Sequence, residues 1–383
     1  MNYKNSAIGL IALTQSIAAQ AQTSVAIFSV LDQGVRYSDG LGLSATSSPS
    51  AAATSTSAIS NGVDRSGRFG LTGTEDLGDG YKALFNLESD LYLNIGSTNP
   101  NLGTDKNTAA ATANKYFERE ASFGLSTPYG KVLFGRQQGV IRDNIDDIDA
   151  INGRFTGFNP NLQYTALNST ALVTSAATYY GTGDPGNGSM MRQDNALKYV
   201  AEVGSVRGTL LYAFGGVTGN SAASSSAQAS LRYNDGLLLL AAAYETLHNP
   251  SDTLKLTAYA AGGRLTLGDW KIAANYGRNS ADNTATTDIK TTISSIGTTY
   301  AVTSAIDLTL GYYNVERNWT NSVKPDAKID RVIAFAEYKF SARTLTYLEY
   351  DYNKWGGDKT QFQGGAANRD TTFGFTIGLN HKI

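Results

Sequence analysis

The stretch TTFGFTIGLNHKI, residues 371–383, determines how the whole chain is interpreted. Its apolar residues share one parity and its small or polar residues share the other, as in a strand whose side chains alternate between two faces of a sheet. The apolar set is Phe373, Phe375, Ile377, Leu379 and Ile383, and the opposite set is Thr372, Gly374, Thr376, Gly378, Asn380 and Lys382. A closed sheet that repeats this pattern has an apolar outer face and a polar lumen, and such a barrel can span a membrane.

The composition is compatible with a membrane barrel. The chain of 383 residues contains 40 Gly, 22 Tyr, 14 Phe and no Cys, and its mean hydropathy is -0.24. Barrels carry apolar residues only at alternate positions, so a low average hydropathy does not argue against a membrane. The lack of cysteine excludes disulfides and thiolate sites. The formal net charge of -2 argues against a nucleic-acid partner, which would require a concentrated basic surface.

The N-terminal residues 1–21 have the features of a secretory signal peptide. Lys4 precedes an apolar run from Ala7 to Leu13, and Ala19-Gln20-Ala21 forms a small-x-small cleavage site. An uncleaved anchor is the alternative, but the run is far shorter than the roughly 20 residues that a membrane helix needs. We therefore predict a mature protein of residues 22–383 that forms one barrel domain and crosses the membrane with strands.

Alternation and turn residues together predict an all-β antiparallel barrel of sixteen strands, the even number expected of a single-chain bacterial barrel. Strand boundaries are uncertain by a few residues, so counts of fourteen or eighteen stay open. The predicted ranges are 23–37, 61–76, 81–95, 115–126, 131–137, 190–202, 206–216, 226–233, 237–247, 253–267, 270–279, 289–301, 306–318, 328–340, 344–355 and 370–383.

The connections between these strands alternate in length. Short turns such as LGDG at 77–80 and TPYG at 127–130 alternate with long polar connections at 38–60, 96–114 and 139–189. Outer-membrane barrels place short turns at the periplasmic rim and long loops outside the cell. A soluble sandwich has no reason to alternate in this way.

Several segments resemble general Gram-negative outer-membrane porins of the β-proteobacterial type. They are TSVAIFSVLDQGVRY (23–37), SGRFGLTGTEDLGDGYKALFNLES (66–89), FEREASFGLSTPYGKVLFGRQ (117–137), RQDNALKYV (192–200) and GLNHKI (378–383). The resemblance implies a homotrimer of 16-stranded transmembrane barrels in the cell outer membrane, surrounded by outer-membrane lipid and lipopolysaccharide. It also implies a water-filled pore narrowed by an inward-folded third external loop, here the connection 139–189. Ile383 is a departure, because the family generally ends in an aromatic residue.

The same resemblance implies a cluster of basic residues on the pore wall, at Arg68, Arg119 and Arg192, with Glu88 on the acidic side. Alternation independently directs Arg68, Glu88 and Arg192 toward the lumen. Arg119 shares the parity of Phe123, so its assignment to the lumen depends on the resemblance. The alternative for all four is that they are solvated lumen residues with no special effect.

The long third connection contains four carboxylates in VIRDNIDDIDAINGRF, namely Asp143, Asp146, Asp147 and Asp149. We expect some of them to face the arginine cluster across the constriction, although Arg142 and Arg154 on the same connection blur which acids matter. A calcium site is the alternative, but the run lacks the oxygen spacing and glycine of an EF-hand, so no metal is expected.

The resemblance implies passive diffusion of small hydrophilic solutes and inorganic ions, with a weak preference for anions from the arginine cluster. No cofactor is expected. An enzyme is disfavoured because the two histidines, His248 and His381, belong to no recognisable catalytic arrangement. A substrate-specific outer-membrane channel is the main alternative, and a barrel adhesin or barrel hydrolase is a weaker one.

Overall fold

The computed structural model describes residues 23–39, 55–98, 116–154, 159–162, 191–282, 286–323, 325–362 and 369–383. The predicted signal peptide and parts of the three long connections lie outside these residues. The strands are β1 (Thr23–Asp39), β2 (Ser55–Asn61), β3 (Arg68–Gly78), β4 (Tyr81–Asp90), β5 (Glu120–Thr127), β6 (Gly130–Gln138), β7 (Arg192–Val203), β8 (Val206–Ala213), β9 (Ser226–Asn234), β10 (Leu238–His248), β11 (Lys255–Leu267), β12 (Trp270–Asp282), β13 (Asp288–Ala301), β14 (Ile306–Thr320), β15 (Ala327–Lys339), β16 (Thr344–Gly357) and β17 (Thr371–Lys382). The helices are α1 (Val140–Ile148) and a short 3-10 turn, η3 (Lys359–Gln361).

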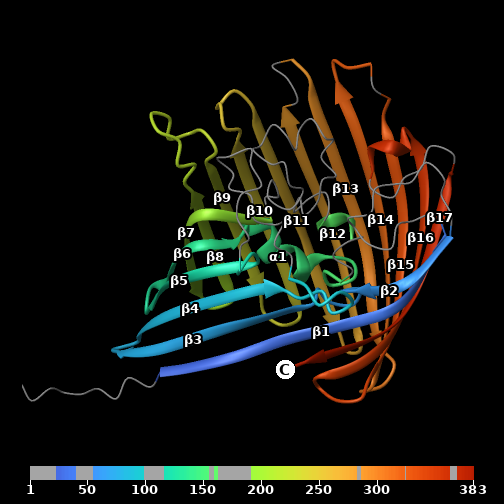
Figure 1. Cartoon of the computed structure of the whole chain (residues 1–383), viewed down its shortest axis with the longest axis horizontal. Helices are drawn as coiled ribbons and strands as arrows, with labels where there is room; N and C mark the ends of the chain where they lie inside the picture. The colour runs from blue at the N-terminus through green and yellow to red at the C-terminus, as the bar shows by residue number, and fades with distance from the viewer. Residues whose placement is uncertain are drawn as a thin grey trace, which may run out of the picture.

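These strands form one closed antiparallel barrel (Figure 1). Each strand from β3 to β16 pairs with the strand that follows it in the chain. The barrel closes because β17 pairs with β1, from Val30↔Lys382 to Asp39↔Phe373. On its other edge β1 pairs with β3 through its first half and with β2 through its second half. β2 and β3 therefore occupy one position in the barrel, and the seventeen strands form sixteen barrel positions, as predicted.

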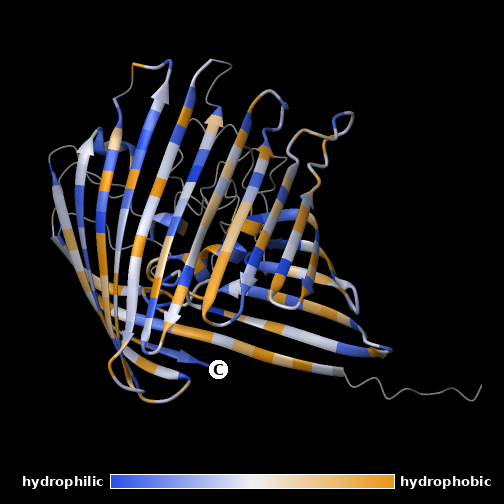
Figure 2. Ribbon diagram, turned by 180° about the vertical axis from the view of Figure 1, so that it is seen from behind, coloured by the Kyte–Doolittle hydropathy of each residue, from blue (hydrophilic) through white to orange (hydrophobic). Residues whose placement is uncertain are grey.

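The two faces of the barrel wall follow the alternation read from the sequence. Outward rows such as Phe85, Phe123, Phe134 and Leu197 are paired across neighbouring strands, and Phe123 and Phe134 expose more than half of their surface. Figure 2 shows apolar and polar residues alternating along most strands. A wide apolar exterior on a closed antiparallel barrel fits a lipid environment.

The connections also alternate as the sequence predicts. Two residues separate β3 from β4, β5 from β6, β7 from β8 and β11 from β12, all at one rim. In the first of these turns Gly78 and Gly80 adopt positive φ, which glycine does without steric cost, and Asp79 between them also has a positive φ. Within the described residues no helix is long and apolar enough to cross a membrane.

The second predicted strand, 61–76, begins later in the structure, at Arg68, as β3. Residues 62–67 form a turn, which we call the inward turn, and β2 (residues 55–61) lies before it, almost entirely within the connection predicted at 38–60. Gly62 has a φ of +74°, and a Cβ at Gly67 would lie 2.4 Å from the Leu91 carbonyl oxygen. These two glycines let the chain leave the sheet. Alternation did not reveal β2, because its sequence, STSAISN, consists mostly of small and polar residues.

Candidate pore constriction

The described part of the third long connection, residues 139–154 and 159–162, packs against the inner face of the barrel. We call it the inward segment; α1 is its main element and contacts β8 through β12 (Figure 1). Val140, Ile141 and Ile145 of α1 are almost fully buried in an apolar cluster with residues of β8, β10, β11, β12 and β13. Burial of each isoleucine contributes about 1.5–3 kcal/mol, so apolar packing holds the segment against this wall.

The barrel wall also supplies the polar contacts at both ends of α1. Its N-cap residue, Gly139, has no side chain to cap the helix. Instead the Val140 amide donates to Gln228 Oε1 (2.9 Å) and the Ile141 amide donates to Glu245 Oε1 (2.6 Å). At the other end Asn275 Nδ2 donates to the Ile148 carbonyl oxygen (3.2 Å). Helix termini leave backbone groups without partners, and here side chains of the wall satisfy them.

Asp149 departs from its predicted role as a pore-lining acid. The residue is fully buried, and its carboxylate accepts bonds from the Ile151 and Gly153 amides, Asn159 Nδ2, Asn161 Nδ2 and the Tyr313 hydroxyl. Burial raises the pKa of this carboxyl, although the hydrogen bonds oppose the shift. Asp149 therefore organises the turn that follows α1 and has no surface to offer a solute. A run of aspartates in the sequence does not show which one is enclosed, so this burial could not be predicted.

The other three acids keep about a third of their side chains exposed, but they pair with cations outside the predicted arginine cluster. Asp143 bonds Lys198 of β7 (2.7 Å). Asp147 pairs with Arg232 of β9 (2.8 Å) and Arg264 of β11 (3.7 Å).

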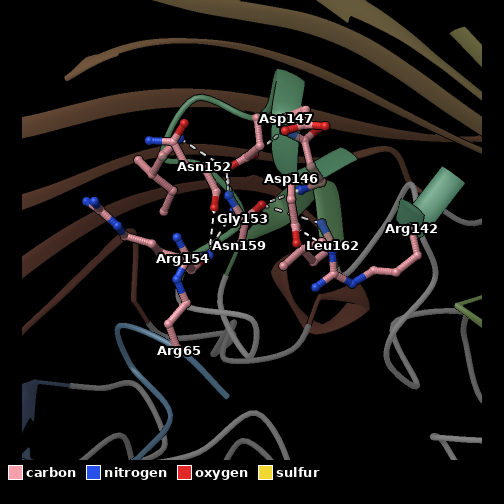
Figure 3. Close-up of polar contacts among 12 residues, drawn as sticks. Arg65, Arg142, Asp146, Asp147, Asn152, Gly153, Arg154, Asn159 and Leu162 are labelled. Atoms are coloured by element: carbon pink, nitrogen blue, oxygen red, sulfur yellow. Dashed lines mark hydrogen bonds and ion pairs between the residues drawn. The ribbon is translucent and has the colours of Figure 1, made fainter. Parts of the chain in front are cut away.

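Asp146 pairs within the helix with Arg142, one turn earlier (Figure 3). The carboxylate of Asp146 is therefore compensated within its own helix.

The structure brings the predicted wall residues together: Arg68 lies on β3, Glu88 on β4, Arg192 on β7, and Arg119 directly before β5. Arg119 forms ion pairs with Glu88 and with Asp90 (2.5 Å), and Arg68 Nε lies 3.7 Å from Glu88 Oε2. The charges of Arg119, Asp90 and Glu88 act on Arg192, which is 7% exposed. The Nε of Arg192 is buried without a hydrogen-bond partner among the described residues.

Two further residues of this wall were missed. Asp90 has the parity of Glu88 two residues earlier, so alternation could have found it. Arg136 pairs with Asp194 (2.6 Å) and donates from Nε to the Glu118 carbonyl oxygen, yet it shares the outward parity of Phe134. The register shift between Gly135 and Gln137 turns Arg136 inward, and Gly135 has a φ of +111°. Such a bulge re-aims a side chain in a way that parity does not predict.

Comparison with known proteins identifies the family. A family model described as Gram-negative porin matches residues 7–358. The chain belongs to this family. Its membership confirms the predicted outer-membrane location and the prediction that the chain is not an enzyme.

Among individual relatives, an outer membrane porin protein of Bordetella pertussis is 35% identical over 157 residues, which are 40% of this chain and 38% of the relative. Outer membrane porin protein 32 of Delftia acidovorans is 31% identical over 159 residues, covering 40% and 39%. The matched region thus spans less than half the length of these curated relatives.

Solved structures confirm the fold. An anion-selective porin from Comamonas acidovorans superposes with a TM-score of 0.71 at 20% identity, covering 94% of this chain and all of that one. The trimer form of OmpT, an outer membrane protein of Vibrio cholerae, superposes with a TM-score of 0.64 at 18% identity, covering 94% and 99%.

Proposed function

We propose that this porin is a water-filled channel for passive diffusion of small hydrophilic solutes and inorganic ions. The observation that carries the proposal is that charged side chains from both sides of the lumen stay accessible to water. Arg68 on the wall and Asp143, Asp146 and Asp147 on the inward segment have side chains that are 29–37% exposed. Such groups replace part of the hydration of a passing solute, and the space between them limits its size.

The proposal includes a weak preference for anions, supported by the balance of charge on the wall. Glu88 and Asp90 both pair with Arg119, and Arg192 Nε has no partner among the described residues. Arg68 shares Glu88 at the longer distance of 3.7 Å. The acids of the inward segment are occupied by Arg142, Lys198, Arg232 and Arg264, so they only partly offset the wall arginines. The Comamonas structure of the same fold is described as anion-selective.

We further propose that the protein is a homotrimer in contact with outer-membrane lipid and lipopolysaccharide, exported with cleavage after residue 21. OmpT of Vibrio cholerae, which shares the fold, has a trimer form. The apolar outer face supports contact with lipid tails.

Single-channel recording of the refolded protein in a salt gradient tests the proposal. We expect closure in three steps, as from three parallel pores, and a reversal potential of the sign given by anion preference. Absence of conductance from a correctly folded barrel would refute the channel. Cation selectivity that persists after Arg68, Arg119 and Arg192 are each replaced by glutamine would refute the role of the cluster.

A further inference from the structure

The inward turn, residues 62–67, contacts the part of the inward segment that directly follows α1. Val63 is 2% exposed and belongs to the same apolar cluster as Ala150 and Ile151, which follow α1. Asp64 is 3% exposed. An uninterrupted strand would have held these side chains in the sheet, so the break at Gly62 is what delivers them to the segment.

Arg154 joins the inward turn, the segment and the barrel wall at one point. Its guanidinium pairs with Glu337 of β15 (2.6 Å) and with Asp64 of the inward turn (3.4 Å), and it donates to Thr309 Oγ1 of β14 (3.0 Å). The guanidinium also lies 5.2 Å from the centre of the Phe335 ring. The Glu337 contact is a charge-assisted hydrogen bond, whereas the Asp64 contact is an ion pair without hydrogen-bond geometry; both are buried, with the arginine side chain 8% exposed.

Arg65 provides a second connection between the same two segments. Its side chain donates from an η nitrogen to the Asn152 carbonyl oxygen (3.0 Å). Its backbone amide donates to Asp32 of β1 (2.5 Å), and Asp32 also accepts from the Tyr347 hydroxyl of β16 (2.7 Å). Figure 3 shows Arg65 and Arg154 beside the turn formed by Asn152 and Gly153. The inward turn is thus fixed to the wall at one end and to the segment at the other.

We propose that the inward turn 62–67 is a clamp that immobilises residues 149–154 and so fixes the cross-section of the pore, with Arg154 as its main positioning residue and Arg65 as a second. This inference rests on the proposed channel function. The segment bears Asp143, Asp146 and Asp147 on α1, immediately before the clamped turn. Loss of the clamp would let these charges move relative to the wall arginines while the barrel stays closed.

Arg154→Ala and Arg65→Ala test the clamp by single-channel recording of the refolded full-length protein. For Arg154→Ala we expect open-channel current noise to rise about threefold, with extra conductance levels and closure at lower voltage, because the docked state of the segment loses its charge-assisted bonds. Arg65→Ala should change the same quantities in the same direction by less, since its backbone bond to Asp32 remains. In Arg154→Lys the current noise should lie between those of the wild type and Arg154→Ala, because the lysine ammonium can still reach one acid.

Arg36→Ala is the matched control. Arg36 is a fully buried arginine of the inner wall that also pairs with two acids, Glu349 (2.8 Å) and Asp351 (2.5 Å), but both are on β16. Its loss should weaken the barrel without raising the noise of the open channel.

Wild-type noise and closing voltage in folded Arg154→Ala and Arg65→Ala would overturn the clamp, as would equal effects in Arg36→Ala. If Arg154→Ala does not fold, Arg65→Ala alone decides. Failure of the channel function itself would appear separately, as absence of conductance in the unmodified protein.

Discussion

The two halves of the inner wall are built differently, although one alternation rule produced both. On β3–β7 the inward residues are charged, and Arg68, Arg119, Arg136 and Arg192 gather there with Glu88 and Asp90. On β8–β16 many inward residues are small or apolar, including Ala243, Leu256, Ala258, Ile293 and Phe335, and the inward segment covers them. On the charged half Arg119 pairs with two acids of the wall itself, Glu88 and Asp90. On the covered half apolar core is mixed with buried polar groups such as Glu245 and Glu337, which bond the inward segment.

The sequence carries a trace of this difference. The run LLLLAAAY at residues 237–244 is apolar at both parities, whereas the strands of the charged half alternate clearly. Strands covered on both faces have near-continuous apolar runs. Such runs in a membrane barrel therefore indicate where a segment of the chain packs inside.

The largest expected effect comes from Asp149→Ala, on the covered half. The change leaves two backbone amides, two asparagine amides and the Tyr313 hydroxyl without their common acceptor. Each buried group left without a partner costs about 1–3 kcal/mol, so the docked segment should lose at least about 3 kcal/mol. Hydrogen exchange of the amides at 149–154 measures the loss. Asp149→Asn keeps an acceptor and should lose less; equal protection in all three proteins would mean that packing alone holds this turn.

A smaller effect is expected from Glu245→Ala, also on the covered half. Glu245 is fully buried and accepts the Ile141 amide at the start of α1. Removing the acceptor should cost about 1–3 kcal/mol of docking stability and reduce the hydrogen-exchange protection of the first turn of α1. Glu245→Gln, which retains an oxygen at the same place, is the control. A variant with unchanged protection would show that the helix is not capped by the wall.

The smallest effect on stability is expected from Arg192→Gln, on the charged half. The Nε of Arg192 has no partner among the described residues, so we expect the substitution to change the unfolding free energy by less than about 1 kcal/mol. The anion preference should fall severalfold, because a charge of the lumen is removed. Reversal potentials in a salt gradient and denaturant titration measure the two quantities. If stability falls more than in Glu245→Ala, or selectivity stays constant, the contrast between the two halves is wrong.

Alternation in the sequence by itself determined that the chain forms an antiparallel barrel with short and long rims, and it determined the inward direction of Arg68, Glu88 and Arg192, because the pleat of a strand assigns every second side chain to each face. The count of sixteen positions, which the sequence left open between fourteen and eighteen, follows from the observed pairings. Only the tertiary structure determined the direction of side chains that lie outside regular strands or at bulges. Arg119 comes one residue before β5 begins, and Arg136 sits at a bulge, so the pleat does not set their direction.

Long-range contacts likewise decided which aspartate is enclosed and where a strand breaks. Asp149 lies at the C-terminal cap of α1, and among its partners are the distant residues Asn159, Asn161 and Tyr313, which Asp143, Asp146 and Asp147 do not contact through the hydrogen bonds of the described residues. The inward turn 62–67 is held by residues as distant in the sequence as Arg154 and Asp32. Local pattern fixes which face a regular strand presents, whereas burial depends on segments that meet only when the barrel closes.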